Sequence, residues 1–176
     1  MKEVEVKILE VDPEGIRKKL KENRAGFVKN VFQRNIFYEN SHTREKNLSL
    51  RIREEEGKAI ITLKGPVEIK GGHKIREEKE VSTKDLEEAK KLFDAMGLKQ
   101  WGVTEARREY YILDGCSVEI IKIPKLPIFI EIEGSEENIK KVASKLGYSE
   151  KDYCAMSALE YYSKVTGDNA SRLVFE

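Results

Sequence analysis

Charged and aliphatic residues alternate in several short segments of the chain. In the first of them, Glu3, Glu5 and Lys7 occupy the odd positions, and valine and isoleucine occupy the even ones. Successive side chains of a β-strand point to opposite faces, so this period of two predicts strands with one charged and one aliphatic face. The predicted strands are residues 2–9, 31–39, 48–54, 58–64, 74–81, 104–113, 117–121 and 128–133.

Helix-start and helix-stop residues predict four helices between and after these strands. The first follows the Asp12-Pro13 pair, an N-cap with proline at the first helical position. The second and third place apolar residues three and four positions apart and end at glycine. The predicted helices are residues 13–22, a segment that starts at Ser82 or Thr83 and stops at Gly97, a segment from Ser135 to Gly147, and residues 153–164.

This order of elements predicts an α+β fold. Eight strands with a few helices favour an antiparallel β-barrel over a parallel sheet. The length of 176 residues suits one domain, so we expect a single domain over residues 1–176 with a C-terminal helical element at about residues 150–166.

The charged strand faces have two interpretations. In an ordinary half-buried sheet, the aliphatic face packs on the core and the charged face meets water. In a closed barrel, the aliphatic faces can instead point outward under the helices, and the charged faces then converge on the lumen. Several strands lack the serine, threonine and glutamine that usually dilute a solvent face, which favours the second interpretation.

Composition limits the function. Charged residues make up 37% of the chain, but the net charge is only +1, so a general basic surface for nucleic acid is not expected. The sequence shows neither an apolar run of membrane-spanning length nor an apolar signal core, and we expect a cytoplasmic protein without a membrane partner. Cys116 and Cys154 fit no metal-binding spacing and are expected to be reduced.

A lumen that holds both carboxylates and cationic side chains suits a polyanion bound with a metal ion. Magnesium prefers one or two carboxylates together with substrate phosphates. Arginine forks match phosphate oxygens, and lysine supplies a point charge. The candidate metal ligands are Glu3, Glu5, Glu131 and Glu133; the candidate phosphate ligands are Arg51, Arg53, Lys64, Arg76 and one of Arg107 and Arg108.

Lys7 has two interpretations. Neighbouring positive charge would lower its pKa and make it a general base towards water. Alternatively, Lys7 simply pairs with Glu5 or Glu133.

The charged strands resemble the CYTH superfamily, the triphosphate tunnel metalloenzymes that include class IV adenylyl cyclases and thiamine triphosphatases. Six motifs follow in the family's order and cover nearly the whole chain. They are Glu3-x-Glu5-x-Lys7, residues 33–38, Leu50-Arg51-Ile52-Arg53, residues 62–66, Arg76-x-Glu78-x-Glu80 and Glu131-x-Glu133.

The resemblance implies a closed eight-stranded tunnel that binds Mg²⁺ or Mn²⁺ and hydrolyses or cyclises a triphosphate. It places Glu3, Glu5, Glu131 and Glu133 near metal, with Glu78 as a further candidate, and it makes Lys7 the candidate catalytic residue. The implied substrate is a small molecule: tripolyphosphate, ATP or thiamine triphosphate. We expect a monomer or a homodimer.

Three positions depart from the family pattern. Asn35 stands where many members have aspartate, and Ile121 stands at a usual aspartate position, with Glu119 as a candidate substitute. Glu105 aligns with a usual lysine. These changes remove one or two acidic ligands and one cation.

Four functions are therefore considered. Hydrolysis of inorganic triphosphate or a small organic triphosphate is preferred, and an adenylyl cyclase is the near alternative. The departures motivate a third, a non-catalytic polyphosphate- or nucleotide-binding module. A single-stranded nucleic-acid barrel would need a basic groove with exposed aromatic residues, which the near-neutral charge disfavours.

Overall fold

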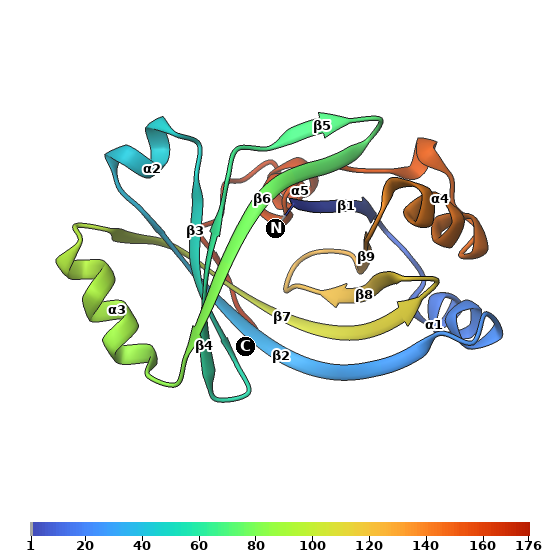
Figure 1. Ribbon diagram of the computed structural model, residues 1–176, viewed down its shortest axis with the longest axis horizontal. Helices are drawn as coiled ribbons and strands as arrows, with labels where there is room; N and C mark the ends of the chain where they lie inside the picture. The colour runs from blue at the N-terminus through green and yellow to red at the C-terminus, as the bar shows by residue number, and fades with distance from the viewer. Residues whose placement is uncertain (1) are drawn as a thin grey trace.

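The computed structural model describes residues 2–176 and consists of a strongly curved β-sheet with helices on its outside (Figure 1). The strands are β1 Lys2–Ile8, β2 Gly26–Glu39, β3 Ser49–Glu55, β4 Lys58–Lys64, β5 Glu68–Lys70, β6 His73–Thr83, β7 Lys99–Leu113, β8 Cys116–Lys122, β9 Phe129–Glu133 and β10 Arg172–Leu173. The α-helices are α1 Pro13–Glu22, α2 Ser41–Glu45, α3 Leu86–Ala95, α4 Glu136–Lys145 and α5 Ala158–Thr166; a 3₁₀ turn covers Glu150–Asp152.

Eight of the strands close into a barrel. Their order is β1-β9-β8-β7-β2-β3-β4-β6, and β6 pairs back onto β1. Every pairing in this ring is antiparallel. The two remaining strands lie outside the ring: β5 pairs with β6, and the short β10 lies parallel to β7. The predicted fold, an α+β protein with a closed antiparallel eight-stranded barrel, is confirmed.

The aliphatic strand faces point outward and are covered by helices. One buried cluster joins Val6, Ile130 and Ile132 of the barrel to Ile16 of α1 and Ile139 of α4. A second cluster places Ala89 and Phe93 of α3 against residues of β2, β3 and β7. Burying apolar area at this outer layer supplies the main favourable term of folding and leaves the opposite strand faces to the lumen.

Two predicted helix starts are wrong because long-range strand pairing competes for the residues. Strand β6 continues to Thr83, which pairs with Ala59, so α3 begins only after its N-cap Asp85. Helix α5 begins after Ser157, because Cys154 is held in a backbone bridge to Lys7. The two hydrogen bonds of this bridge measure 3.1 and 2.9 Å.

The other helix starts are confirmed. The Asp12 side chain accepts hydrogen bonds from the backbone N–H groups at the start of α1, and Ser135 caps α4 in the same way. Strands β2 and β7 are longer than predicted, and α2, β5 and β10 were not predicted. No helix in residues 2–176 combines the length and apolarity needed to cross a membrane.

The outer apolar layer can be tested with Ile139→Ala, which truncates a fully buried side chain between α4 and the barrel. We expect the free energy of unfolding to fall by about 2–5 kcal/mol, measured by urea denaturation. The matched control is Ile69→Ala on β5, where the side chain is 64% exposed and the change should stay within about 0.5 kcal/mol. Equal losses in both variants would contradict the assignment of the core.

Candidate active site

The barrel encloses a cavity of about 700 Å³. All eight ring strands contribute side chains to its wall, and Ser157 and Ala158 at the start of α5 join them. Of the candidate residues, those that line the cavity are Glu3, Glu5, Lys7, Arg51, Arg53, Lys64, Arg76, Glu78, Arg108, Glu131 and Glu133. The interpretation in which the charged strand faces converge on the lumen is therefore the one that the structure shows.

Arg107 is the one candidate that lies elsewhere. It is exposed on the outer face of β7, and its guanidinium lies 5.2 Å from the centre of the Phe175 ring. Neighbouring residues of a strand face opposite sides, and Arg108 is the one that points into the cavity. The choice between the two arginines thus falls on Arg108.

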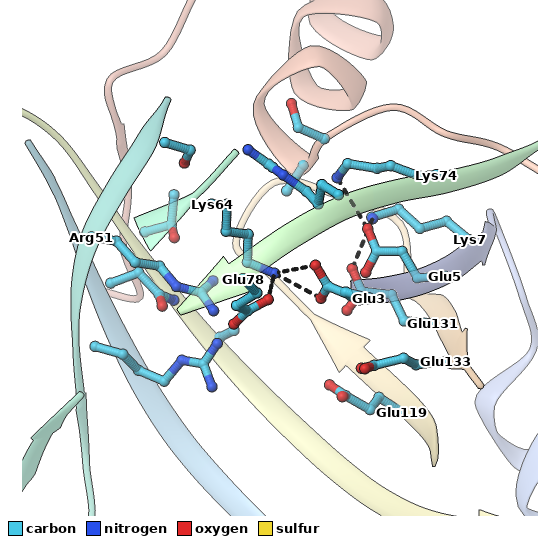
Figure 2. Close-up of a pocket in the computed structure, with 18 of the residues that line it drawn as sticks. Glu3, Glu5, Lys7, Arg51, Lys64, Lys74, Glu78, Glu119, Glu131 and Glu133 are labelled. Carbon is cyan, nitrogen blue, oxygen red and sulfur yellow. Dashed lines mark hydrogen bonds and ion pairs between the residues drawn. The ribbon is translucent and has the colours of Figure 1, made fainter. Parts of the chain in front are cut away.

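Carboxylates collect on one side of the cavity, where Lys7 and Lys74 accompany them, and Arg51 lies on the other side. Most of the carboxylates come from the adjoining strands β1, β9 and β8, where Glu5 is paired in register with Glu133, and Glu119 with Glu131. Figure 2 shows these carboxylates on one side and Arg51 on the far side, with Lys64 and Glu78 between them. A bound molecule would therefore meet an acidic wall and a cationic wall at the same time.

Lys7 is held between two carboxylates. Its Nζ lies 2.9 Å from an oxygen of Glu5 and 3.0 Å from an oxygen of Glu131. Burial alone would lower the pKa of Lys7, but the negative charges of Glu131 and Glu5 outweigh it, and the pKa is raised. The hypothesis that positive neighbours lower this pKa is wrong, and the alternative of pairing holds for Glu5, with Glu131 as the second partner in place of Glu133.

Lys74 is a cavity cation that the sequence analysis did not identify. It lies 3.0 Å from Glu5, and its pKa is lowered by burial and by the charge of Lys7. The available signal was its position, since Lys74 shares one strand face with Arg76 and Glu78.

Several carboxylates already have cationic partners. Glu131 lies 3.0 Å from Lys7 and 2.9 Å from Arg108, and although its burial opposes ionisation, these two cations lower its pKa. Lys64 bridges the other side of the acidic wall, 2.7 Å from Glu3 and 2.6 Å from Glu78. The ion pairs offset the cost of removing these charges from water.

Arg51 and Arg53 have no such partner. Within residues 2–176, neither side chain forms a hydrogen bond or an ion pair, and the buried Nε atom of each is without an acceptor. Burial, together with the nearby charges of Arg53 and Arg108, lowers the pKa of Arg51 to about 10. Two neighbouring guanidiniums that lack acceptors form a suitable site for an anion.

Glu133 is the corresponding exception on the acidic wall. None of the lysines and arginines in residues 2–176 forms an ion pair with it, and its burial and the charges of Glu3 and Glu119 raise its pKa to about 7. A divalent cation at this wall would remove the repulsion between these carboxylates.

The carboxylates fit a metal ion that is held partly by substrate. No group of three or more histidine, cysteine or acidic residues in the described part of the chain forms a complete metal site by itself. Magnesium needs only one or two carboxylates when phosphates supply further oxygens. Glu133 together with Glu5 meets that requirement, because Glu133 has no ion pair with a lysine or arginine of residues 2–176 and Glu5 contacts Lys7 and Lys74 through Oε1 alone. Both oxygens of Glu3 contact Lys64, and Glu131 and Glu78 also bind cationic side chains.

The three departures from the family pattern have different structural outcomes. Asn35 lines the cavity, and its buried Oδ1 atom has no hydrogen-bond donor. Ile121 is fully buried in an apolar cluster, while Glu119 lines the cavity, as the substitution hypothesis expected.

Glu105 does not occupy the position of a missing lumen cation. It faces away from the cavity, accepts the backbone N–H of Phe175 at 2.8 Å and lies 3.6 Å from Arg34. The inward position two residues before Arg108 belongs to Ala106, so Glu105 is not a lumen position.

A closed eight-stranded barrel with oppositely charged inner walls is the architecture that comparisons with known proteins also support. A family model described as the CYTH domain matches residues 1–157, and the chain belongs to this family. A protein of Methanocaldococcus jannaschii named "Putative adenylate cyclase MJ0240" is 33% identical over 143 residues, which are 80% of this chain and 81% of that protein.

Two solved structures are similar to this fold over most of the chain. The PH1012 protein of Pyrococcus horikoshii is 29% identical, with a TM-score of 0.78 over 90% of this chain and 98% of that chain. A conserved hypothetical protein of Pyrococcus furiosus is 26% identical, with a TM-score of 0.77 over 90% of this chain and 99% of that chain.

The environment of Glu133 predicts a pH dependence of stability. Its folded-state pKa, about 7, lies above the ordinary value of 4.5, so the folded protein binds the extra proton between these limits. The resulting stabilisation is fully present below pH 4.5 and is lost as the pH rises through 7. Glu133→Gln should therefore raise the thermal unfolding midpoint more at pH 8 than at pH 5, measured in buffer with a metal chelator.

The control for this prediction is Glu68→Gln on the exposed strand β5. Its effect on the midpoint should be the same at both pH values. A Glu133→Gln variant with a pH-independent effect would contradict the electrostatic description of the acidic wall.

Proposed function

We propose that the protein hydrolyses a triphosphate inside the barrel with the help of a divalent metal ion. The observation that carries this proposal is the pair of guanidiniums of Arg51 and Arg53, whose buried Nε atoms have no acceptor in the described chain and which line the same cavity as the acidic wall. A triphosphate supplies negative oxygens to the arginines and, on its other side, oxygens to a cation held by carboxylates.

The cationic side chains of the cavity would bind the phosphate chain. Arg51 and Arg53 would hold the phosphate chain, and Arg76 and Arg108, which also line the cavity, would extend this contact along it. Lys64 stands between the two walls, so it can orient a phosphate while it stays bonded to Glu3 and Glu78. Fixing the chain along several contacts aligns the phosphorus atom for attack.

The metal ligands we propose are Glu133, Glu3 and Glu5, with Glu119 close by on β8. When bound, Mg²⁺ or Mn²⁺ would neutralise charge on the phosphate oxygens. Glu131 and Glu78 remain predicted ligands, and each of them, like Glu3, would have to exchange a lysine or arginine contact for the metal.

Lys7 acts in this proposal as a protonated group. Its raised pKa, caused by Glu131 and Glu5 in spite of burial, keeps the ammonium charged. A charged donor in the cavity stabilises negative charge that develops on phosphate oxygen during transfer. It also holds the Glu5 and Glu131 carboxylates in fixed positions.

A second candidate is an adenylyl cyclase, which the name of the Methanocaldococcus jannaschii relative favours. In that reaction, the ribose 3′-hydroxyl attacks the α-phosphate, and pyrophosphate leaves. Apolar side chains of Ala106, Ile123 and Ala158 on the cavity wall could contact an organic group. Both reactions need the same phosphate-binding side chains.

The test uses the purified protein with tripolyphosphate, ATP or thiamine triphosphate, each with Mg²⁺ or Mn²⁺. Orthophosphate, pyrophosphate and cyclic AMP are measured separately. Orthophosphate from tripolyphosphate is the expected result, whereas cyclic AMP with pyrophosphate from ATP would establish the cyclase. Binding of tripolyphosphate without turnover under any condition would identify a binding module and overturn the proposal.

Arg51→Met should lower kcat/KM for the triphosphate by about 10²–10³-fold, because a preorganised cationic donor is lost from the site. Arg107→Met is the matched control, since Arg107 lies outside the barrel on Phe175. The control should keep the activity of the unmodified protein. Similar activity in the two variants would show that the phosphate site is wrongly placed.

A further inference from the structure

The lumen beyond Arg53 is closed by a cluster of four polar side chains. The cluster consists of Lys29 and Gln33 from β2, Glu55 from β3 and Tyr110 from β7. Among the described residues, the cavity wall includes Asn35 and Arg53 but none of these four. The cavity therefore ends where the cluster begins.

Hydrogen bonds and one ion pair hold the cluster together. The Gln33 amide donates to Glu55 Oε2 at 2.6 Å and contacts the Tyr110 hydroxyl at 2.8 Å. Lys29 forms an ion pair with Glu55, and its Nζ lies 5.1 Å from the centre of the Tyr110 ring. Gln33 is fully buried and Glu55 is 6% exposed, so these two residues lie in the barrel interior, while Lys29 and Tyr110 are partly exposed.

Glu55 continues the row of arginines on β3. Arg51, Arg53 and Glu55 alternate with outward-facing residues, so they share the inner face of this strand. A phosphate chain that follows the two arginines would next meet a carboxylate. Burial alone would raise the pKa of Glu55, but contacts with Lys29 and Gln33 lower it, so the carboxylate is charged at neutral pH.

We infer that Glu55 determines specificity by ending the phosphate-binding track, so that the tunnel accepts a triphosphate and excludes longer polyphosphates. The inference rests on the proposed function, because it assumes that a phosphate chain lies along Arg51 and Arg53. Like charges placed directly against each other in a binding site strongly disfavour association. Lys29 and Gln33 act as positioning residues, since they bind the carboxylate at the end of the track, and Tyr110 holds the Gln33 amide.

The polar character of the cluster supports a role in discriminating between phosphate chains of different length. Elsewhere in the barrel, the interior is filled by apolar contacts, as around Ile121 and Phe129. An apolar filling would close the lumen beyond Arg53 without the cost of burying a charge pair. The carboxylate contributes what an apolar filling does not, which is repulsion of a further phosphate. Its partner Lys29 has a side chain that is 38% exposed, against 7% for Glu55, so water screens the lysine charge more than the carboxylate charge.

The test compares tripolyphosphate with tetrapolyphosphate by calorimetric titration, in metal-free buffer so that no turnover occurs. The unmodified protein should bind tetrapolyphosphate no more tightly than tripolyphosphate. Glu55→Ala should shift the ratio of the two dissociation constants about tenfold in favour of tetrapolyphosphate. Glu56→Ala is the matched control: Glu56 is exposed outside the lumen, 4.0 Å from Lys29, and its loss should leave the ratio unchanged.

Two further variants separate the possible causes. Glu55→Ala alone leaves Lys29 without its Glu55 partner, and this lysine could itself attract a further phosphate. The double variant Lys29→Met with Glu55→Ala lacks that lysine, and it should keep the shift of the dissociation-constant ratio in favour of tetrapolyphosphate. Glu55→Gln keeps the size of the side chain and should shift the ratio in the same direction by less. It also serves as the test variant if Glu55→Ala does not fold, as judged by circular dichroism.

The outcomes distinguish the inference from the proposed function. A folded Glu55→Ala protein with the ratio of the unmodified protein overturns the inference and leaves the proposed function intact. The inference is also overturned if the double variant shows no shift of the ratio, because Lys29 without its Glu55 partner would then be the cause of the shift in Glu55→Ala. If the unmodified protein binds no tripolyphosphate with or without Mg²⁺, the proposed function fails and the inference fails with it.

Discussion

The cost of removing charge from water governs the interior of this barrel. A buried carboxylate or ammonium group is stable only when opposite charge or hydrogen bonds replace its hydration. Lys7 with Glu5, and Glu131 with Arg108, meet this condition within the chain. Arg51, Arg53 and Glu133 do not, and they lie on opposite walls of one cavity. These unpaired charges indicate the ligands that the cavity suits: an anion beside the arginines and a cation beside Glu133.

The same constraint explains why the barrel is built with its aliphatic faces outward. On several strands the lumen side chains alternate with aliphatic ones, and α1, α3 and α4 bury those outer residues. The outer apolar layer stabilises the fold and leaves the interior for chemistry. The free energy gained by packing this outer layer therefore offsets the cost of burying charge in the lumen, and the outer residues take no part in binding.

The sequence predicts most of the site, because strand alternation places residues without tertiary information. Counting alone assigns Glu3 and Glu5 to one face of β1, and Arg51 and Arg53 to one face of β3. The method failed on β7, where Thr104 to Tyr111 contains no clear aliphatic alternation to show that Ala106 and Arg108 point inward. It also failed for the pKa of Lys7 and for the start of α5, because Glu131 and the Cys154 bridge are distant in sequence.

The backbone bridge between Lys7 and Cys154 connects the two ends of the chain at the site. Both backbone groups of Lys7 are bonded to Cys154, and the segment that follows leads to Ser157 and Ala158 on the cavity wall. The shape of the tunnel thus depends on residues near the C-terminal boundary of the CYTH match, outside the charged strand motifs. Two family members with identical motifs can therefore diverge in ligand preference through this tail alone, and a comparison restricted to the motifs would not detect it.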